Sequence, residues 1–194
     1  PEAANAVLLT QAEFQLDQGQ HEQALATLRR LDDNSKNHGH ALALMGRLYF
    51  RLEDWVSLQE ILPRVKKHAQ IKPETLAIWT SRIHREQLQD AIDGDAILLA
   101  WKNVPKSHKS DMPLLEAYYQ GLMRAGLHEK AEKELVAALK SDWCGPLVQL
   151  FGQVQGADAS KQLTTAEGWL TSHAEDPDLL LTAARLCLKN ELWG

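Results

Sequence analysis

The stretch AEFQLDQGQHEQALATL (residues 12–28) aligns with GRLYFRLEDWVSLQEIL (residues 46–62), and the fold of the chain is predicted from this self-match. The paired positions lie 34 residues apart, so that Ala12 corresponds to Gly46. A third copy, YQGLMRAGLHEKAEKELVAAL (residues 119–139), repeats the same order of small and apolar residues. A fixed period of this length is the sequence signature of a repeat protein.

Each copy predicts two short amphipathic helices joined in a hairpin. In the third copy, Leu115 and Leu122 lie at helical spacing before the turn, and Ala131 and Leu135 continue an apolar stripe after it. Gly126 stands between the two helices, where a left-handed residue is wanted to end the first of them. A single hairpin cannot bury both of its faces, so neighbouring hairpins must stack on it.

The 34-residue period, with these residue sizes, is typical of tetratricopeptide (TPR) repeats. We therefore predict an all-α chain, a single domain over residues 1–194 that forms a right-handed TPR-like solenoid of about five to six degenerate helical hairpins. No segment shows the alternation of a half-buried strand. The expected units are residues 5–38, 39–72, 73–105, 112–145, 146–176 and a truncated unit at 177–194.

The composition is that of an ordinary globular domain, with 44% hydrophobic and 24% charged residues. The net charge is −5 with both signs interspersed, so we expect no nucleic-acid partner, which would require a basic stripe. No apolar run approaches the roughly 18–20 residues that span a bilayer, and no signal peptide is recognisable. Because the sequence opens at Pro1 without a methionine, we expect it to be a fragment of a longer protein.

Three segments together resemble the HemY family of Gram-negative bacteria, whose members carry an N-terminal pair of membrane helices followed by a TPR region. The segments are YFRLEDWVSLQEILPRVKKH (49–68), LLAWKNVPKSHK (98–109) and DPDLLLTAARLCLKNELWG (176–194). The resemblance implies a domain held at the inner membrane by a preceding anchor, on the cytoplasmic side. It also implies a link to late protohaem synthesis, with the enzymes of that synthesis as expected protein partners of a non-enzymatic scaffold.

The expected binding surface is the concave groove that the first helix of each hairpin lines in TPR domains. Arginine presents paired donors that suit carboxylates, so an acidic protein segment, the carboxyl terminus of a partner protein or porphyrin propionates are the candidate ligands. An equally weighted alternative is that these arginines are merely solvated and pair with Glu13, Asp17 or Glu116. The candidate groove residues are Arg47, Arg51, His84, Arg85, Gln120 and Arg124.

A second hypothesis is a tetrapyrrole carrier, with haem or a precursor in the groove and His84 as its ligand. We expect no metal site otherwise, because no two histidines stand one helical turn apart and the only close pair, His38 and His40, lies at a turn. No phosphate loop, nucleophile elbow or catalytic set is recognisable, so we do not expect an enzyme.

The stretch SDWCGPLVQL (141–150) begins like a thioredoxin active site, but the position of the second cysteine holds Leu147. We predict that Cys144 only links two repeats, with Gly145 permitting the bend and Pro146 opening the next helix. Cys187 is expected to be a small buried hydrophobe.

The end of the sequence, KNELW (189–193), aligns with LEDW (52–55), so Trp193 corresponds to the residue that begins a second helix at Trp55. We therefore expect the sixth hairpin to lack its second helix. The uncovered part of its first helix is predicted to support self-association, because the ends of solenoids need caps.

Overall fold

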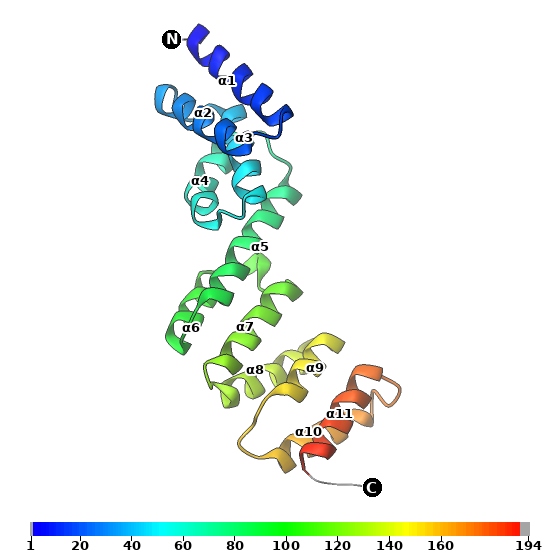
Figure 1. The fold of residues 1–194 in the computed structure, drawn as a ribbon. Coiled ribbons are helices and arrows are strands. Elements are labelled where there is room, and N and C mark those ends of the chain that lie inside the picture. Colours follow the sequence, from blue (N-terminus) through cyan, green and yellow to red (C-terminus); the bar gives the residue numbers. More distant parts are fainter. Residues whose placement is uncertain (1, 191–194) are drawn as a thin grey trace. The chain divides into compact units, whose positions relative to one another are not determined.

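The structure, a computed structural model, describes residues 2–190. Over this range the regular elements are 11 α-helices and one short 3-10 helix, with no strand, which confirms the all-α prediction (Figure 1). Trp193, on which the expected truncation of the sixth hairpin depends, lies outside the described residues.

The protein divides into two compact units, residues 1–86 and 87–194. In the first unit α1 packs on α2, α2 on α3 and α3 on α4, and the greater part of α5 belongs to the same unit. The helices are α1 (Glu2–Asp17), α2 (His21–Asn34), α3 (Gly39–Arg51), α4 (Trp55–His68) and α5 (Pro73–Asp90).

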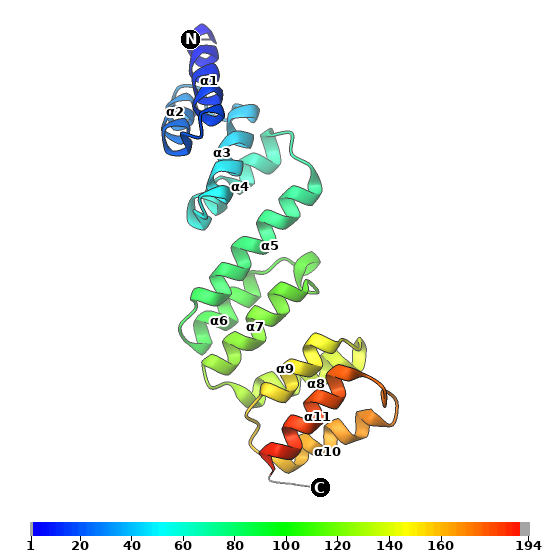
Figure 2. The ribbon, with the colours of Figure 1, turned by 45° about the vertical axis from the view of Figure 1, so that its right-hand side comes forward.

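In the second unit α7 packs on α6, α8 and α9, while α11 packs on both α9 and α10 (Figure 2). The helices are α6 (Gly94–Asn103), the 3-10 helix η1 (Lys106–His108), α7 (Met112–Arg124), α8 (His128–Ser141), α9 (Gly145–Gln153), α10 (Ala159–Leu170) and α11 (Pro177–Lys189).

Three of the hairpin turns have the same backbone geometry at equivalent sequence positions. Gly19 has a φ of 72°, Glu53 a φ of 55° and Gly126 a φ of 74°, so all three are left-handed. In each turn the next residue donates its N–H to the carbonyl five positions earlier, at distances of 2.8, 2.9 and 2.8 Å. This is the Schellman pattern of helix ends, and it confirms the role predicted for Gly126.

The helices of each unit meet where small residues allow close approach. A Cβ atom on Gly46 of α3 would lie 2.5 Å from the ring of Trp79 on α5, and one on Gly152 of α9 would lie 2.9 Å from Thr182 on α11. The hydroxyl of Thr182 also donates to the carbonyl of Val148 at 3.1 Å. Because Gly46, Trp79 and Thr182 lie in the buried core, these contacts fix which helices are neighbours.

Candidate functional site

The predicted groove residues of the first unit lie on two helices that are in contact. Arg47 and Arg51 are exposed and stand one turn apart on α3, while His84 and Arg85 are half-buried on α5. Helices α3 and α5 meet through Gly46 and Trp79, so the structure brings the two pairs onto neighbouring elements.

The carboxylates predicted as alternative partners of Arg47 and Arg51 do not form ion pairs with them in the part of the protein that the structure describes. The Glu13 carboxylate lies 2.9 Å from Nε2 of His40, and within residues 2–190 no ion pair joins Arg47 or Arg51 to Glu13 or Asp17. His40 thus connects α1 to the start of α3, a contact that the sequence analysis did not anticipate.

The two remaining groove candidates, Gln120 and Arg124, are exposed on α7 in the second unit. Arg124 donates through Nη2 to the carbonyls of Leu88 and Gln89, at 3.2 and 3.1 Å. These carbonyls belong to the last turn of α5, where a basic side chain satisfies acceptors that the helix leaves unpaired. One guanidinium nitrogen of Arg124 is therefore occupied in joining α7 to the end of α5. The predicted role of Arg124 in binding a ligand stays a prediction.

Cys144 is the N-terminal cap residue of α9, with an extended backbone, and Pro146 lies in the first turn of that helix. Cys144 lies between α8 and α9, as predicted, and its role as only a link between two repeats stays a prediction. Gly145 was predicted to permit a bend in the chain. The structure gives a different reason for glycine at this position, because a Cβ atom there would overlap the carboxylate of Asp178. Glycine therefore provides space for α11. Cys187 is only half-buried, and both cysteines are free thiols.

Trp143, beside Cys144, ties the start of α9 to the start of α11. Its Nε1 donates to Oδ2 of Asp176 at 2.7 Å, and its ring stacks on His173 with centroids 3.8 Å apart. Asp176 also accepts from the backbone N–H groups of Asp178 and Leu179. The hydrogen bond from Trp143, more than any other contact, holds the pKa of Asp176 below its usual value.

Other groups with a shifted pKa lie in contacts between helices. Arg64 of α4 forms a two-pronged pair with Asp32 of α2, at 2.9 and 2.5 Å, which lowers the pKa of Asp32. Tyr118 donates to Glu134 at 2.9 Å, and burial is the main cause that raises the pKa of its hydroxyl. Burial likewise raises the pKa of Tyr119 to about 12. Such pairs join neighbouring helices.

In the part of the protein that the structure describes, no group of three histidine, cysteine, aspartate or glutamate side chains is placed to hold a metal ion. His38 uses its Nδ1 to accept the N–H of Ala41 at the start of α3. His84, the proposed haem ligand, is half-buried on α5.

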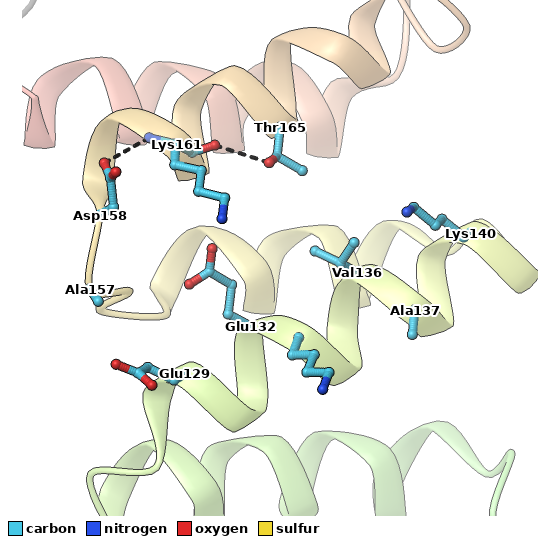
Figure 3. Close-up of a pocket in the computed structure, with 10 residues that line it drawn as sticks. Glu129, Glu132, Val136, Ala137, Lys140, Ala157, Asp158, Lys161 and Thr165 are labelled. Atoms are coloured by element: carbon cyan, nitrogen blue, oxygen red, sulfur yellow. Dashed lines mark hydrogen bonds between the residues drawn. The ribbon is translucent and has the colours of Figure 1, made fainter.

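A second candidate surface is the hollow between α8 and α10, which has a volume of about 590 Å³ (Figure 3). Its walls combine charged side chains of both signs with a few small or apolar ones. The residues that line it are Glu129, Glu132, Lys133, Val136, Ala137, Lys140, Ala157, Asp158, Lys161 and Thr165. Sequence reasoning missed this site, since nothing in the repeat pattern indicates how far apart two second helices stand.

Comparison with known proteins adds no family: no protein-family model matches the sequence, and no curated protein or solved structure shows a significant match. Among residues 2–190 no helix is both long enough and apolar enough to cross a bilayer.

Proposed function

We propose that this protein is a non-catalytic protein-binding domain, built as a solenoid of degenerate TPR-like hairpins. The observation that carries the proposal is the recurrence of one turn geometry at the repeat spacing. The left-handed residues Gly19 and Glu53 lie 34 positions apart, and Gly126 occupies the equivalent position of a later hairpin.

Several contacts between helices support the same arrangement, because their sequence separations lie near the repeat length. The separation is 34 residues for the bond from Thr182 to Val148 and 33 for that from Trp143 to Asp176. It is 32 for the pair of Arg64 with Asp32. Contacts at this separation are what the stacking of similar units would produce, and they support the proposed arrangement.

The exposed arginines of α3 favour partners that carry carboxylates. Arg47 and Arg51 project from the same side of the helix, one turn apart, without an ion pair to Glu13 or Asp17 among the described residues. Two guanidinium groups at this spacing suit an acidic segment or the carboxyl terminus of a partner. The resemblance to the HemY family leads us to include the enzymes of late protohaem synthesis as partners at the inner membrane.

The test is capture of those enzymes from the membranes of a Gram-negative bacterium, with identification by mass spectrometry. We expect Arg47→Glu combined with Arg51→Glu to reduce capture about tenfold or more, because each contact of a charged group is worth about 1.5–3 kcal/mol. Helicity, measured by circular dichroism, should be unchanged, since both side chains are exposed.

The matched control is Arg30→Glu combined with Lys36→Glu, an equal charge change at exposed positions on and just after α2. This control should capture the enzymes as well as the wild type. Equal capture by the Arg47 and Arg51 double variant would refute the role of these arginines.

A further inference from the structure

We propose that the face shared by α3 and α5 binds a partner segment in which an apolar residue stands about three positions from acidic residues. In this proposal Arg47, Arg51 and Arg85 bind the acidic residues, and Leu44 and Ile78 contact the apolar one. The inference rests on the proposed function, because it specifies the sequence of the acidic segment that the arginines bind.

Helices α3 and α5 lie side by side and run in the same direction. A Cβ atom on Gly46 would touch the ring of Trp79, and the ring of Phe50, one turn later on α3, stacks on the same indole with centroids 6.2 Å apart. Further along, the guanidinium of Arg82 on α5 lies 5.1 Å from the ring centroid of Trp55, which follows α3. Because these contacts advance together along both helices, positions near Gly46 are level with positions near Trp79.

One side of this helix pair is buried and the other is accessible. Tyr49 of α3 and Ile83 of α5 belong to one core cluster. An α-helix turns by about 100° per residue, so the positions five before, two before and two after each of these residues lie on the far side of its helix. The residues at those positions, all of them exposed or half-buried, are Leu44, Arg47, Arg51, Ile78, Ser81 and Arg85.

The three arginines of this face are not neutralised by ion pairs. Over residues 2–190 no ion pair joins Arg47, Arg51 or Arg85 to a carboxylate. Glu86, the residue next to Arg85, is instead paired with Arg82 at 3.2 Å. Because Arg51 and Arg85 are level with each other on adjacent helices, both can bind neighbouring carboxylates of one segment.

The other carboxylates around this face do not cancel its positive charge. Asp54 accepts a backbone N–H at the start of α4, and Glu13 of α1 lies against a histidine of α3. Glu74 stands in the first turn of α5, at the opposite end of that helix from its arginine. Glu53, in the turn after α3, is the remaining acid near Arg51, and three arginines outnumber it. The complementary ligand is therefore acidic.

Apolar side chains stand at the other end of the same face. Ile78 is 58% exposed, and Leu44, which precedes it by one repeat of 34 residues, is half-buried. Leu44 stands two residues before Gly46 and Ile78 one residue before Trp79, so the two are level. A single exposed apolar residue is ordinary, but two that are level on adjacent helices offer a contact surface for an apolar side chain.

The spacing of the two ends determines the spacing expected in the partner. Seven residues, or about two helical turns, separate Leu44 from Arg51 and Ile78 from Arg85, which corresponds to about 10 Å along the helices. An extended chain covers this distance in about three residues, at about 3.3 Å each. The partner segment should therefore carry its apolar residue about three positions from its acidic ones.

The probes are two acetylated and amidated peptides, Leu-Ala-Ala-Glu-Glu and the reverse sequence Glu-Glu-Ala-Ala-Leu, because a bound segment can run in either direction along the helices. Each is titrated into the 194-residue protein labelled with nitrogen-15. We expect one of them to cause saturable shifts of the amide resonances of Arg47, Ile78 and Arg85. Replacement of its leucine by alanine, or of both glutamates by glutamine, should weaken binding about fivefold.

The decisive variant is Ile78→Ser, which should weaken binding of the leucine peptide about fivefold and leave binding of its alanine version unchanged. Unfolding cannot explain an effect confined to one of two peptides. Val56→Ser, at a 70% exposed position of α4, is the matched control and should bind both peptides as the wild type does. Arg85→Gln should weaken the glutamate peptide about fivefold and leave its glutamine version unchanged.

The outcomes separate this inference from the proposed function. If Ile78→Ser weakens the leucine and alanine peptides equally, or neither, while Arg47→Glu with Arg51→Glu abolishes binding, the apolar requirement is wrong and the arginines still bind acidic segments. If the arginine double variant binds as tightly as the wild type, the proposed function fails as well. The inference is also overturned if neither peptide causes a saturable shift. Shifts that depend on protein concentration without peptide would overturn it too, by identifying a second copy of the protein as the occupant.

Discussion

Glu53 holds a left-handed backbone conformation, with a φ of 55°, at the position where two other hairpin turns carry glycine. For a residue with a Cβ atom this conformation costs about 1–2 kcal/mol, part of which glycine loses again through its greater entropy in the unfolded state. We expect Glu53→Gly to raise the free energy of unfolding by up to about 1 kcal/mol, measured by urea denaturation.

The matched change is Gly19→Ala, which introduces the same strain at the equivalent turn 34 positions earlier. Nothing lies within 4 Å of a Cβ atom at Gly19, so the conformation alone should lower its stability. Destabilisation by Glu53→Gly would contradict the equivalence of the two turns.

The role of a residue could be predicted from sequence where that role involves only its neighbours along the chain. Gly126 was identified from sequence because a helix-ending glycine acts on its own turn. The roles of Gly145 and Arg124 depend on groups 33 and 36 positions away, the carboxylate of Asp178 and the carbonyl of Leu88. No local pattern marks such partners, so their roles required the structure.

At the scale of the element, the start of α11 depends on one carboxylate. Asp176 accepts the N–H groups of Asp178 and Leu179 and the indole N–H of Trp143. Loss of a cap residue typically lowers stability by about 1 kcal/mol. We expect that effect for Asp176→Ala at pH 7, and little for the neighbouring exposed Glu175→Ala, by urea denaturation.

The carboxylate of Asp176 also determines in which direction the stability of the protein changes with pH. Because the pKa of Asp176 is lowered in the folded protein, its contribution is present above its unfolded pKa of about 3.9 and is lost as the pH falls through the folded value. The difference between wild type and Asp176→Ala should therefore shrink in acid. A difference that is unchanged from pH 7 to pH 2 would contradict this role.

Helices were the most predictable part of the molecule, because periodicity and capping residues are local signals. The two helices predicted on either side of Gly126 are α7 (Met112–Arg124) and α8 (His128–Ser141). The segment between the expected units 73–105 and 112–145 holds the 3-10 helix Lys106–His108, which the hairpin pattern did not predict. The hollow between α8 and α10 was not predictable, since it depends on packing between hairpins.

At the scale of the whole molecule, the exposed apolar side chains of α11 bear on the expected self-association. Leu180 and Leu188 lie two turns apart and are 49% and 56% exposed. An exposed apolar face of this kind is a surface that a partner protein or a second copy of the protein would cover. Self-association through this end stays a prediction.

Contacts that join mainly sequence neighbours should confine a local defect to nearby helices. Gly46→Ala places a Cβ atom 2.5 Å from the ring of the buried Trp79, which should lower stability by about 1–3 kcal/mol, less about 1 kcal/mol from the better helix propensity of alanine. Because stability in a repeat array is a sum of local terms, we expect faster amide hydrogen exchange in α3, α4 and α5 but unchanged exchange in α9 to α11.

The control for that experiment is Gly168→Ala, since no atom lies within 4 Å of a Cβ atom there. It should slow exchange in α10 through helix propensity alone, by the equivalent of up to about 1 kcal/mol. If Gly46→Ala instead accelerated exchange equally in every helix, the protein would unfold as one cooperative body. That outcome would contradict the repeat arrangement on which the proposed binding function rests, because a repeat array should keep a defect local.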